Sequence, residues 1–211
     1  DGMILTRTYE NDKYVKFLKQ KQIPFVEVGK FPDDDVVQVD HDNVGACREL
    51  VTVLFAKGIQ NIAYLGSNMD QMVNRCRYQG YEEAFRKGKR KLNPDLVYTD
   101  LSSKAMVEKA VEELKKSGVE CILCQDDYIC DEVVRKLARM GVRIPDQMKV
   151  ASCHYSRILE NYPITVTSLK FNITELGRRS CQVLLDVIHG KTVPDKTLLD
   201  YEIILKESTK G

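Results

Sequence analysis

The chain has 211 residues, of which 43% are hydrophobic and 30% are charged, and its formal net charge is +1. This length allows one large domain or two small ones, and the composition is typical of a globular protein. A net charge so close to zero gives no overall field that would draw the chain to nucleic acid or to a membrane. No apolar run approaches the roughly 20 residues that a membrane-spanning helix needs, so we expect no membrane partner.

The chain has seven cysteines, an odd number, whereas a secreted disulfide framework usually pairs its cysteines evenly. Cys47, Cys121 and Cys181 fall at apolar positions of the pattern, so we interpret the thiols as reduced, buried side chains of a cytoplasmic protein. Cys121 and Cys124 form a C-x-x-C, but no second pair accompanies them, and residues three apart in a strand face opposite sides. We therefore expect neither a metal site nor a cofactor.

Taken in chain order, the sequence alternates between short apolar runs and longer segments with helical periodicity. In the first part we expect strands at 2–5, 23–28 and 36–39. A helix is expected at about 12–21, and a second one is capped by Asp42-Asn43 and ended by Gly58.

The rest of the chain continues this alternation. Further strands are expected at 59–66, 96–100, 119–124, 148–153, 165–171 and 198–205. Helices are expected after the polar loop 67–74 through about Lys87, after a cap at Ser102 or Ser103, after a cap at Asp126, and from about Ile173 to Ile188.

Strand–helix alternation with nearly continuous apolar strands indicates parallel sheets that are covered by helices. The glycines that end the helices, at 58, 88, 118 and 141, recur at the spacing of one strand–helix unit. They reflect topology and do not indicate a repeat protein. In such folds ligands bind beyond the carboxyl ends of the strands, and Asp126-Asp127 follows one of those ends.

The sequence contains none of the signatures GxSxG, HExxH, GxGxxG or GxxxxGK[ST]. His41, His154 and His189 are far apart, and nothing in the pattern gathers them around a nucleophile. The basic run 86–91 follows a helix end, where cations suit the helix dipole, and lacks interleaved aromatic residues. We expect no enzyme, and we interpret this run as a solvated face.

Two features leave a structural and a functional interpretation open. A helix N-cap explains one of Asp126 and Asp127, while the other carboxylate can face a ligand cleft at the end of its strand. Arg77 lies early in the helix after the polar loop. Its guanidinium is either a surface group or a fork that binds ligand hydroxyl or carboxylate groups.

Several segments in order resemble the lactose-repressor/galactose-repressor family of bacterial transcription regulators. The segments are "DGMIL", "DNVGACRELVTVLFAKGIQNIAYLG", "RCRYQGYEEAF", "CILCQDDYICDEVVRKLARMGVRIPDQMKVASC" and "ITVTSLKFNITELGRRSCQVLLDVIHGK". Together they extend over essentially the whole chain. No single motif decides the match, but their order and spacing are specific.

The resemblance implies an α/β fold of the periplasmic-binding-protein-like type I. Such a fold has two Rossmann-like subdomains with parallel sheets flanked by helices, joined by crossover strands. The first subdomain is expected to comprise 1–43 plus 167–190 and to be incomplete, because the family has two more strand–helix units before the "DGMIL" strand. The second is expected to comprise 44–166 plus 191–211.

The resemblance also implies effector-binding residues. Arg77 matches the family arginine that binds effector hydroxyl or carboxylate groups, and Asp126 matches the first residue of the family's Asn-Asp pair, which favours Asp126 for the cleft. Asp127 matches the second residue of that pair, and Asn68 in the polar loop is a further candidate. His154 stands where the family commonly has a sugar-binding aspartate. Since histidine is a poorer acceptor and can carry charge, this departure suits an effector with an acidic group; the alternative is drift at a site with another ligand geometry.

We therefore expect the effector-sensing domain of a cytoplasmic transcription regulator, most simply a repressor. The expected partners are a small-molecule effector (a sugar, a sugar phosphate or a sugar acid), a second copy of the chain in a homodimer, and operator DNA that is bound through a helix-turn-helix outside this chain. The alternative is a sugar-binding protein of a transporter with the same fold, which upstream sequence would distinguish.

Overall fold

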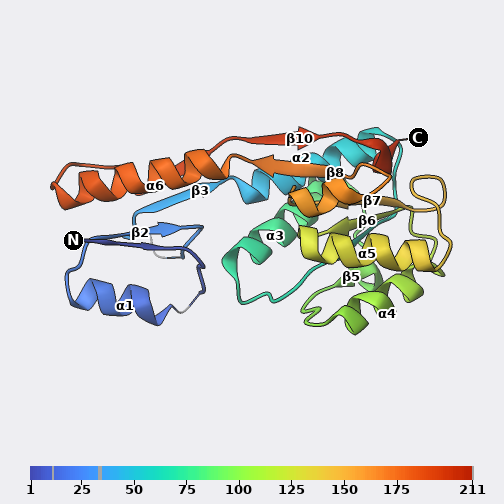
Figure 1. Ribbon diagram of the computed structural model, residues 1–211, viewed down its shortest axis with the longest axis horizontal. Coiled ribbons are helices and arrows are strands. Elements are labelled where there is room, and N and C mark those ends of the chain that lie inside the picture. Colours follow the sequence, from blue (N-terminus) through green and yellow to red (C-terminus); the bar gives the residue numbers. More distant parts are fainter. Residues whose placement is uncertain (11, 33–34, 211) are drawn as a thin grey trace.

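The computed structural model describes residues 1–10, 12–32 and 35–210 and contains two sheets that lie one beyond the other along the molecule (Figure 1). The smaller sheet has the order β1-β2-β3-β9, and all of its neighbouring strands are parallel. Its strands are β1 (Met3–Leu5), β2 (Phe25–Val28), β3 (Gln38–His41) and β9 (Lys196–Leu199).

The larger sheet has the order β10-β8-β7-β6-β4-β5, in which β10 and β8 are antiparallel and the other neighbours are parallel. Its strands are β4 (Ile62–Leu65), β5 (Val97–Tyr98), β6 (Cys121–Cys124), β7 (Lys149–Ser152), β8 (Thr167–Phe171) and β10 (Tyr201–Ile204). The expectation of parallel sheets flanked by helices is confirmed.

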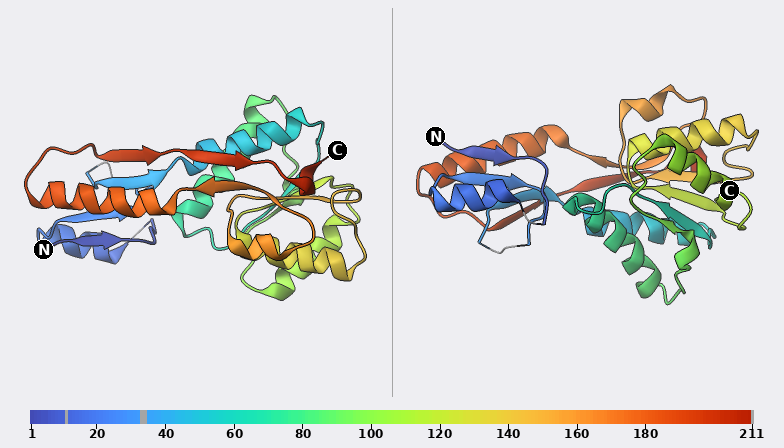
Figure 2. Two further views of the ribbon diagram at one scale, coloured as in Figure 1. Left: turned by 45° about the horizontal axis from the view of Figure 1, so that its top comes forward. Right: turned by 90° about the horizontal axis from the view of Figure 1, so that it is seen from below.

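Helices cover both faces of each sheet (Figure 2). On the smaller sheet, Val15 of α1 packs with Phe25, while Val183 of α6 packs with Val26 on the opposite face. On the larger sheet, α2 and α3 cover one face, and α4 and α5 cover the other. The helices are α1 (Lys13–Gln20), α2 (Asn43–Ala56), α3 (Met72–Lys87), α4 (Lys104–Leu114), α5 (Asp127–Arg139) and α6 (Ile173–Ile188).

The C-x-x-C lies entirely within β6, where both thiols are buried and free. Cys121 packs in the core under α2 and α3, whereas Cys124 packs in the core under α4 and α5. The two side chains therefore face opposite sides of the sheet, as the alternation of a strand requires.

The chain crosses between the sheets three times, and each time a single polar residue stands between the two elements. Asp42 separates β3 from α2 and accepts a hydrogen bond from the Gly45 amide at 2.8 Å. Asn172 separates β8 from α6 and accepts one from the Glu175 amide at 3.0 Å. Asp200 separates β9 from β10. At two of the crossings, then, an N-cap starts a helix where the chain changes sheets.

The expected segment boundaries differ from this sheet membership. The segment 167–190 was expected in the first subdomain, but β8 pairs with β7 in the larger sheet, so only α6 belongs with the smaller one. The segment 191–211 was expected in the second subdomain, but β9 pairs with β3 in the smaller sheet. The apolar run 198–205 reads as one strand, whereas the break at Asp200 divides it between two sheets.

A related shift affects β3, which was expected at 36–39 and begins two residues later. Val36 is not part of the strand and packs against Val15 and Phe31 instead. The strand therefore ends at His41, which brings two polar residues, Asp40 and His41, to its carboxyl end.

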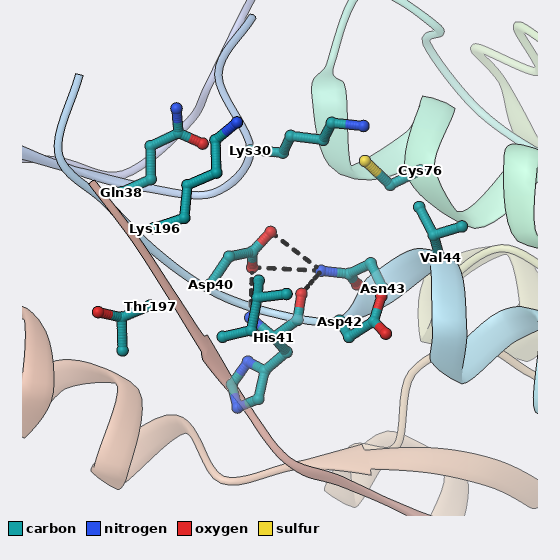
Figure 3. Close-up of a pocket in the computed structure, with 11 residues that line it drawn as sticks. Lys30, Gln38, Asp40, His41, Asp42, Asn43, Val44, Cys76, Lys196 and Thr197 are labelled. Carbon is teal, nitrogen blue, oxygen red and sulfur yellow. Dashed lines mark hydrogen bonds between the residues drawn. The ribbon is translucent and has the colours of Figure 1, made fainter. Parts of the chain in front are cut away.

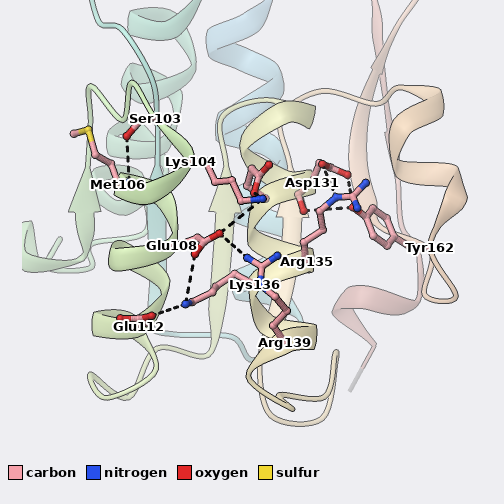
Figure 4. A network of polar contacts seen from close by, with 11 residues as sticks. Ser103, Lys104, Met106, Glu108, Glu112, Asp131, Arg135, Lys136, Arg139 and Tyr162 are labelled. Carbon is pink, nitrogen blue, oxygen red and sulfur yellow. Dashed lines mark hydrogen bonds and ion pairs between the residues drawn. The ribbon is translucent and has the colours of Figure 1, made fainter.

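Ion pairs connect the outer faces of α4 and α5 (Figure 4). Glu108 of α4 forms ion pairs with Arg139 at 2.6 Å and with Lys136 at 3.7 Å, both from α5. Within α4 it also pairs with Lys104 at 3.9 Å, and Lys136 pairs with Glu112. Such exposed pairs contribute at most about 1 kcal/mol each. In the part of the chain that the structure describes, no helix is long and apolar enough to cross a membrane.

Close packing of α2 on α3 yields a stability prediction at Gly80. A Cβ atom there would lie 2.4 Å from the Val44 carbonyl oxygen and 2.8 Å from Cys47 Cβ, so we expect Gly80→Ala to lower the free energy of unfolding by roughly 1–3 kcal/mol. Gly177 in α6 has no atom within 4 Å of such a Cβ. As the matched control, Gly177→Ala should raise stability by about 0.5–1 kcal/mol. Urea unfolding followed by circular dichroism measures both, and a Gly80→Ala protein at least as stable as the parent would contradict this packing.

Candidate functional site

The carboxyl ends of strands from both sheets border one cleft, a cavity of about 230 Å³. The smaller sheet contributes the loop after β1 and the ends of β2 and β3, and the larger sheet contributes the segment after β7 and the end of β8. Helices α3 and α6 begin at its walls. Residues that line it include Thr8, His41, Arg77, His154, Phe171 and Leu176. This is the position at which parallel α/β folds bind ligands.

Arg77 of α3 is only 8% exposed and is held by two hydrogen bonds. Its Nε donates to Asn43 Oδ1 at 3.3 Å, and its Nη1 donates to the Gln125 carbonyl oxygen at 3.0 Å. Its Cζ lies 5.9 Å from the centre of the Phe171 ring. These contacts fix the guanidinium at the cleft and leave its Nη2 for a further acceptor.

Asn43 extends this contact into the smaller sheet (Figure 3). Its Nδ2 donates to the Asp40 carboxylate at 3.2 and 3.4 Å and to the His41 carbonyl oxygen at 3.2 Å. Burial raises the pKa of Asp40 to about 6, although its hydrogen bonds and Arg77 act in the opposite direction. Asp40 and Asn43 also border a second cavity of about 170 Å³, together with Lys30 and Cys76.

Two imidazoles flank the Phe171 ring in the cleft. The His41 ring centre is 4.9 Å from that of Phe171, and the His154 ring is stacked on it at 6.2 Å. His41 Nε2 and His154 Nδ1 are buried without a hydrogen-bond partner. Burial, and next the charge of Arg77, lower the pKa of His154; burial is also the largest cause that lowers the pKa of His41. Both shifts favour the neutral form of the rings.

Of the expected site residues, Arg77 and His154 line the cleft. Asp126 does not line it, because it is the N-cap of α5 and its Oδ1 accepts a hydrogen bond from the Ile129 amide at 2.9 Å. Asp127 is buried in the first turn of α5 and is also absent from the lining. Both carboxylates are still close enough to favour the protonated form of His154.

The match to the family favoured Asp126 for the cleft and so left Asp127 to start the helix, but Asp126 is the cap and neither carboxylate lines this cavity. The cap falls one residue earlier, so the polar residue before it is Gln125, whose backbone holds Arg77. Its side chain is fully buried and accepts a hydrogen bond from the Ser67 amide at 2.8 Å.

Asn68 was also expected at the cleft, but it is exposed and does not line the cavity. Its Oδ1 accepts a hydrogen bond from the Asp70 amide at 2.7 Å, which folds the loop back on itself. The Asn68 carbonyl oxygen accepts a hydrogen bond from Asn74 Nδ2 at 2.6 Å. Asn68 therefore shapes the loop that precedes α3.

One side of the cleft is closed where the loop after β1 meets the start of α3. The Met72 amide donates to the Thr8 carbonyl oxygen at 3.0 Å, and Tyr9 forms an isolated bridge with Gln71. Arg75 and Glu10 pair at 2.9 Å beside them. These contacts join the two sheets without a covalent connection.

The sequence did not identify His41, Asn43 and Phe171 as site residues. Asn43 was interpreted only as part of a helix cap, and Phe171 only as an apolar strand residue. The available signal was the pair Asp40-His41, since two polar residues that directly follow an apolar strand mark the carboxyl end where ligands bind. Because the strand was expected at 36–39, these two residues were not placed at the carboxyl end of β3.

A family model described as a periplasmic binding protein-like domain matches residues 51–209. The chain belongs to the family of periplasmic-binding-protein-like domains. It is 27% identical over 214 residues to the HTH-type transcriptional regulator CelR of Thermobifida fusca, which covers 99% of this chain and 63% of the relative. It thus spans about three fifths of the length of the curated relatives that it matches.

Two solved structures support the same assignment. A transcriptional regulator CelR–cellobiose complex has a TM-score of 0.89 at 26% identity. The match covers 99% of this chain and 65% of the chain in that complex. A putative LacI transcriptional regulator from Bacillus cereus subsp. cytotoxis NVH 391-98 has a TM-score of 0.90 at 27% identity. The match covers 100% of this chain and 76% of that regulator's chain. The resemblance to the lactose-repressor/galactose-repressor family is confirmed.

The role of Asp126 as a cap can be tested by stability. Because Asp126→Ala removes the acceptor for the Ile129 amide, we expect it to lower the free energy of unfolding by about 1 kcal/mol. Asp126→Asn keeps a side-chain oxygen at the cap and should change stability by less than about half of that amount. Equal losses in the two variants, measured by urea unfolding, would show that the carboxylate acts by its charge and not as a cap.

Proposed function

We propose that this chain is the effector-sensing domain of a bacterial transcription regulator, a repressor of the lactose-repressor/galactose-repressor type. Its DNA contacts would be made by a helix-turn-helix outside this chain, in a cytoplasmic homodimer. The observation that supports this most is the cleft between two sheets, lined by Arg77, His41 and His154. The relatives in the comparisons are named as transcription regulators and not as enzymes.

The effector that we propose is a sugar, a sugar phosphate or a sugar acid. The name of one similar structure includes cellobiose, and the cleft combines polar groups with an apolar wall of Phe171, Ile173 and Leu176. Such a wall suits the C–H face of a sugar ring, while a guanidinium suits its hydroxyl or acidic groups. Ile173 is 69% exposed, so a bound ligand could cover its side chain.

The proposed mechanism uses the three crossings as a hinge. A ligand that touches both sheets favours the arrangement in which the cleft is closed, and so it shifts the population only by its difference in affinity for the two arrangements. In a homodimer, that shift would change the relative position of the attached DNA-binding heads. A transporter protein with the same fold is the less favoured alternative, because the relatives are named as regulators.

The test is a thermal-shift screen of this chain against sugars, sugar phosphates and sugar acids. We expect at least one compound to raise the melting temperature, since a ligand that binds only the folded state stabilises it. Arg77→Ala should remove that shift, because the side chain lines the cleft.

The matched control is Arg86→Ala, at the other end of the same helix, where the side chain is 75% exposed and pairs only weakly with Glu83. It should leave the ligand-induced shift unchanged. Circular dichroism verifies that both variants are folded. If Arg77→Ala binds the compound as tightly as the parent chain does, the effector site has been assigned to the wrong cavity.

A further inference from the structure

The cleft holds unmet hydrogen-bonding capacity around one guanidinium. His41 is only 5% exposed, and its Nε2 has no partner; His154 Nδ1 is likewise buried and unpaired. Both rings and the Arg77 Cζ lie within 6.2 Å of the centre of Phe171. A buried polar atom without a partner is unfavourable, so the two imidazole nitrogens, together with the free donor capacity of Arg77, offer hydrogen bonds to a ligand.

The chemistry of the three groups selects the class of ligand atom. Arg77 has already given Nε and one Nη1 hydrogen to Asn43 and Gln125, and it can only donate. An imidazole can donate from both nitrogens when it is protonated. An oxyanion is an acceptor only, so it can be bound by the guanidinium and by protonated rings at the same time.

We propose that Arg77, His41 and His154 form an oxyanion subsite for a carboxylate, phosphate or sulfate group, and that its occupation draws protons onto the two histidines. This inference rests on the proposed function, because the anionic group would belong to the effector. It names the acidic derivatives among the sugars as the class of effector.

The direction of the proton linkage follows from the groups that face the rings. Burial is the largest cause that lowers the pKa of both histidines, and Arg77 of α3 lowers both as well. A hydrogen bond with the Asn172 backbone raises the pKa of His41, and the charge of His154 lowers it. Asp127 and Asp126, at the start of α5, raise the pKa of His154. An anion beside Arg77 offsets its positive charge and accepts hydrogen bonds from the rings, and both effects raise the pKa of the two histidines.

Two other charged groups border the same cleft, Asp40 from β3 and Arg7 from the loop after β1. An added negative charge raises the pKa of Asp40 further above about 6. Arg7 is exposed and adds positive charge at this edge of the cleft. The histidines and Asp40 thus respond to an anion by taking up protons. The affinity for an anion therefore rises as the pH falls from 8 toward 6, by up to about tenfold per pH unit for each proton bound.

The experiment is a proton NMR titration of the histidine rings with sulfate as the probe. The chain has three histidines, and His189 at the exposed end of α6 is an internal reference. We record the ring resonances against pH in sodium sulfate and in sodium chloride of equal ionic strength. His41→Gln and His154→Gln assign the two cleft signals.

We expect sulfate to raise the apparent pKa of His41 and His154 by at least about half a unit, equivalent to a threefold or larger preference for the protonated rings, and to leave His189 unchanged. Arg77→Met should abolish the response, and Arg86→Met should retain it. An equal shift of all three histidines, or no shift in the parent chain, overturns the subsite without any variant.

The result also separates this inference from the effector-sensing function. A neutral sugar that stabilises the chain through Arg77, together with no response to sulfate, refutes the oxyanion subsite and leaves the sensing function standing. A sulfate response without any stabilising sugar derivative supports the subsite and counts against the sugar-sensing function.

Discussion

The arrangement of the cleft depends on one buried guanidinium. Arg77 donates to Asn43, the first residue after the crossing from the smaller sheet, and to the backbone at the end of β6 in the larger sheet. A guanidinium cannot lose its charge in the protein, so burial forces the surrounding groups to adapt to it. The carbonyl of Gln125 and the side-chain oxygen of Asn43 provide uncharged acceptors, while burial and Arg77 favour the neutral form of the two imidazoles. The result is a fixed positive charge with donor capacity left toward the ligand.

In the proposed mechanism, the same residues would connect ligand binding to the relative arrangement of the two sheets. Asn43 joins Arg77 to Asp40 at the end of β3, so in the proposed mechanism a ligand bound to the guanidinium would be connected to the smaller sheet. Each crossing is a single residue, which allows a change of backbone angles at few positions to reorient whole sheets. The bridge between Tyr9 and Gln71 and the pair of Arg75 with Glu10 are the weak, non-covalent contacts that such a movement would break or rearrange.

Local rules predicted much of this fold, because buried strands and amphipathic helices leave clear periodic patterns. The caps at Asp42, Ser103 and Asp126 follow from side chains that accept nearby amides, and the structure has all three. The division of residues 198–205 into two strands is set by pairing partners far away in the chain, which a local pattern does not contain. A similar limit explains β3, whose apolar Val36 packs in the core instead of pairing.

Site residues could be predicted where the residue type itself indicates ligand binding. They could not be predicted where the role depends on the place of the residue in the fold. Arg77 and His154 were identified and lie in the cleft. The match favoured Asp126 for the cleft, but Asp126 is the helix cap. Adjacent residues at a strand end can have these two different roles, and the residue type alone does not distinguish them. His41 was missed because its importance comes from the strand end at which it lies.

The most direct test of the role of Arg77 is a double-mutant cycle with Asn43→Ala and Arg77→Met, in which urea unfolding gives the free energy of each variant. The two side chains share one hydrogen bond to a charged group, so the cycle should give a coupling energy of about 1–2 kcal/mol. Losses that add within about 0.3 kcal/mol would mean that Arg77 does not tie the crossing to the larger sheet, and would contradict the account.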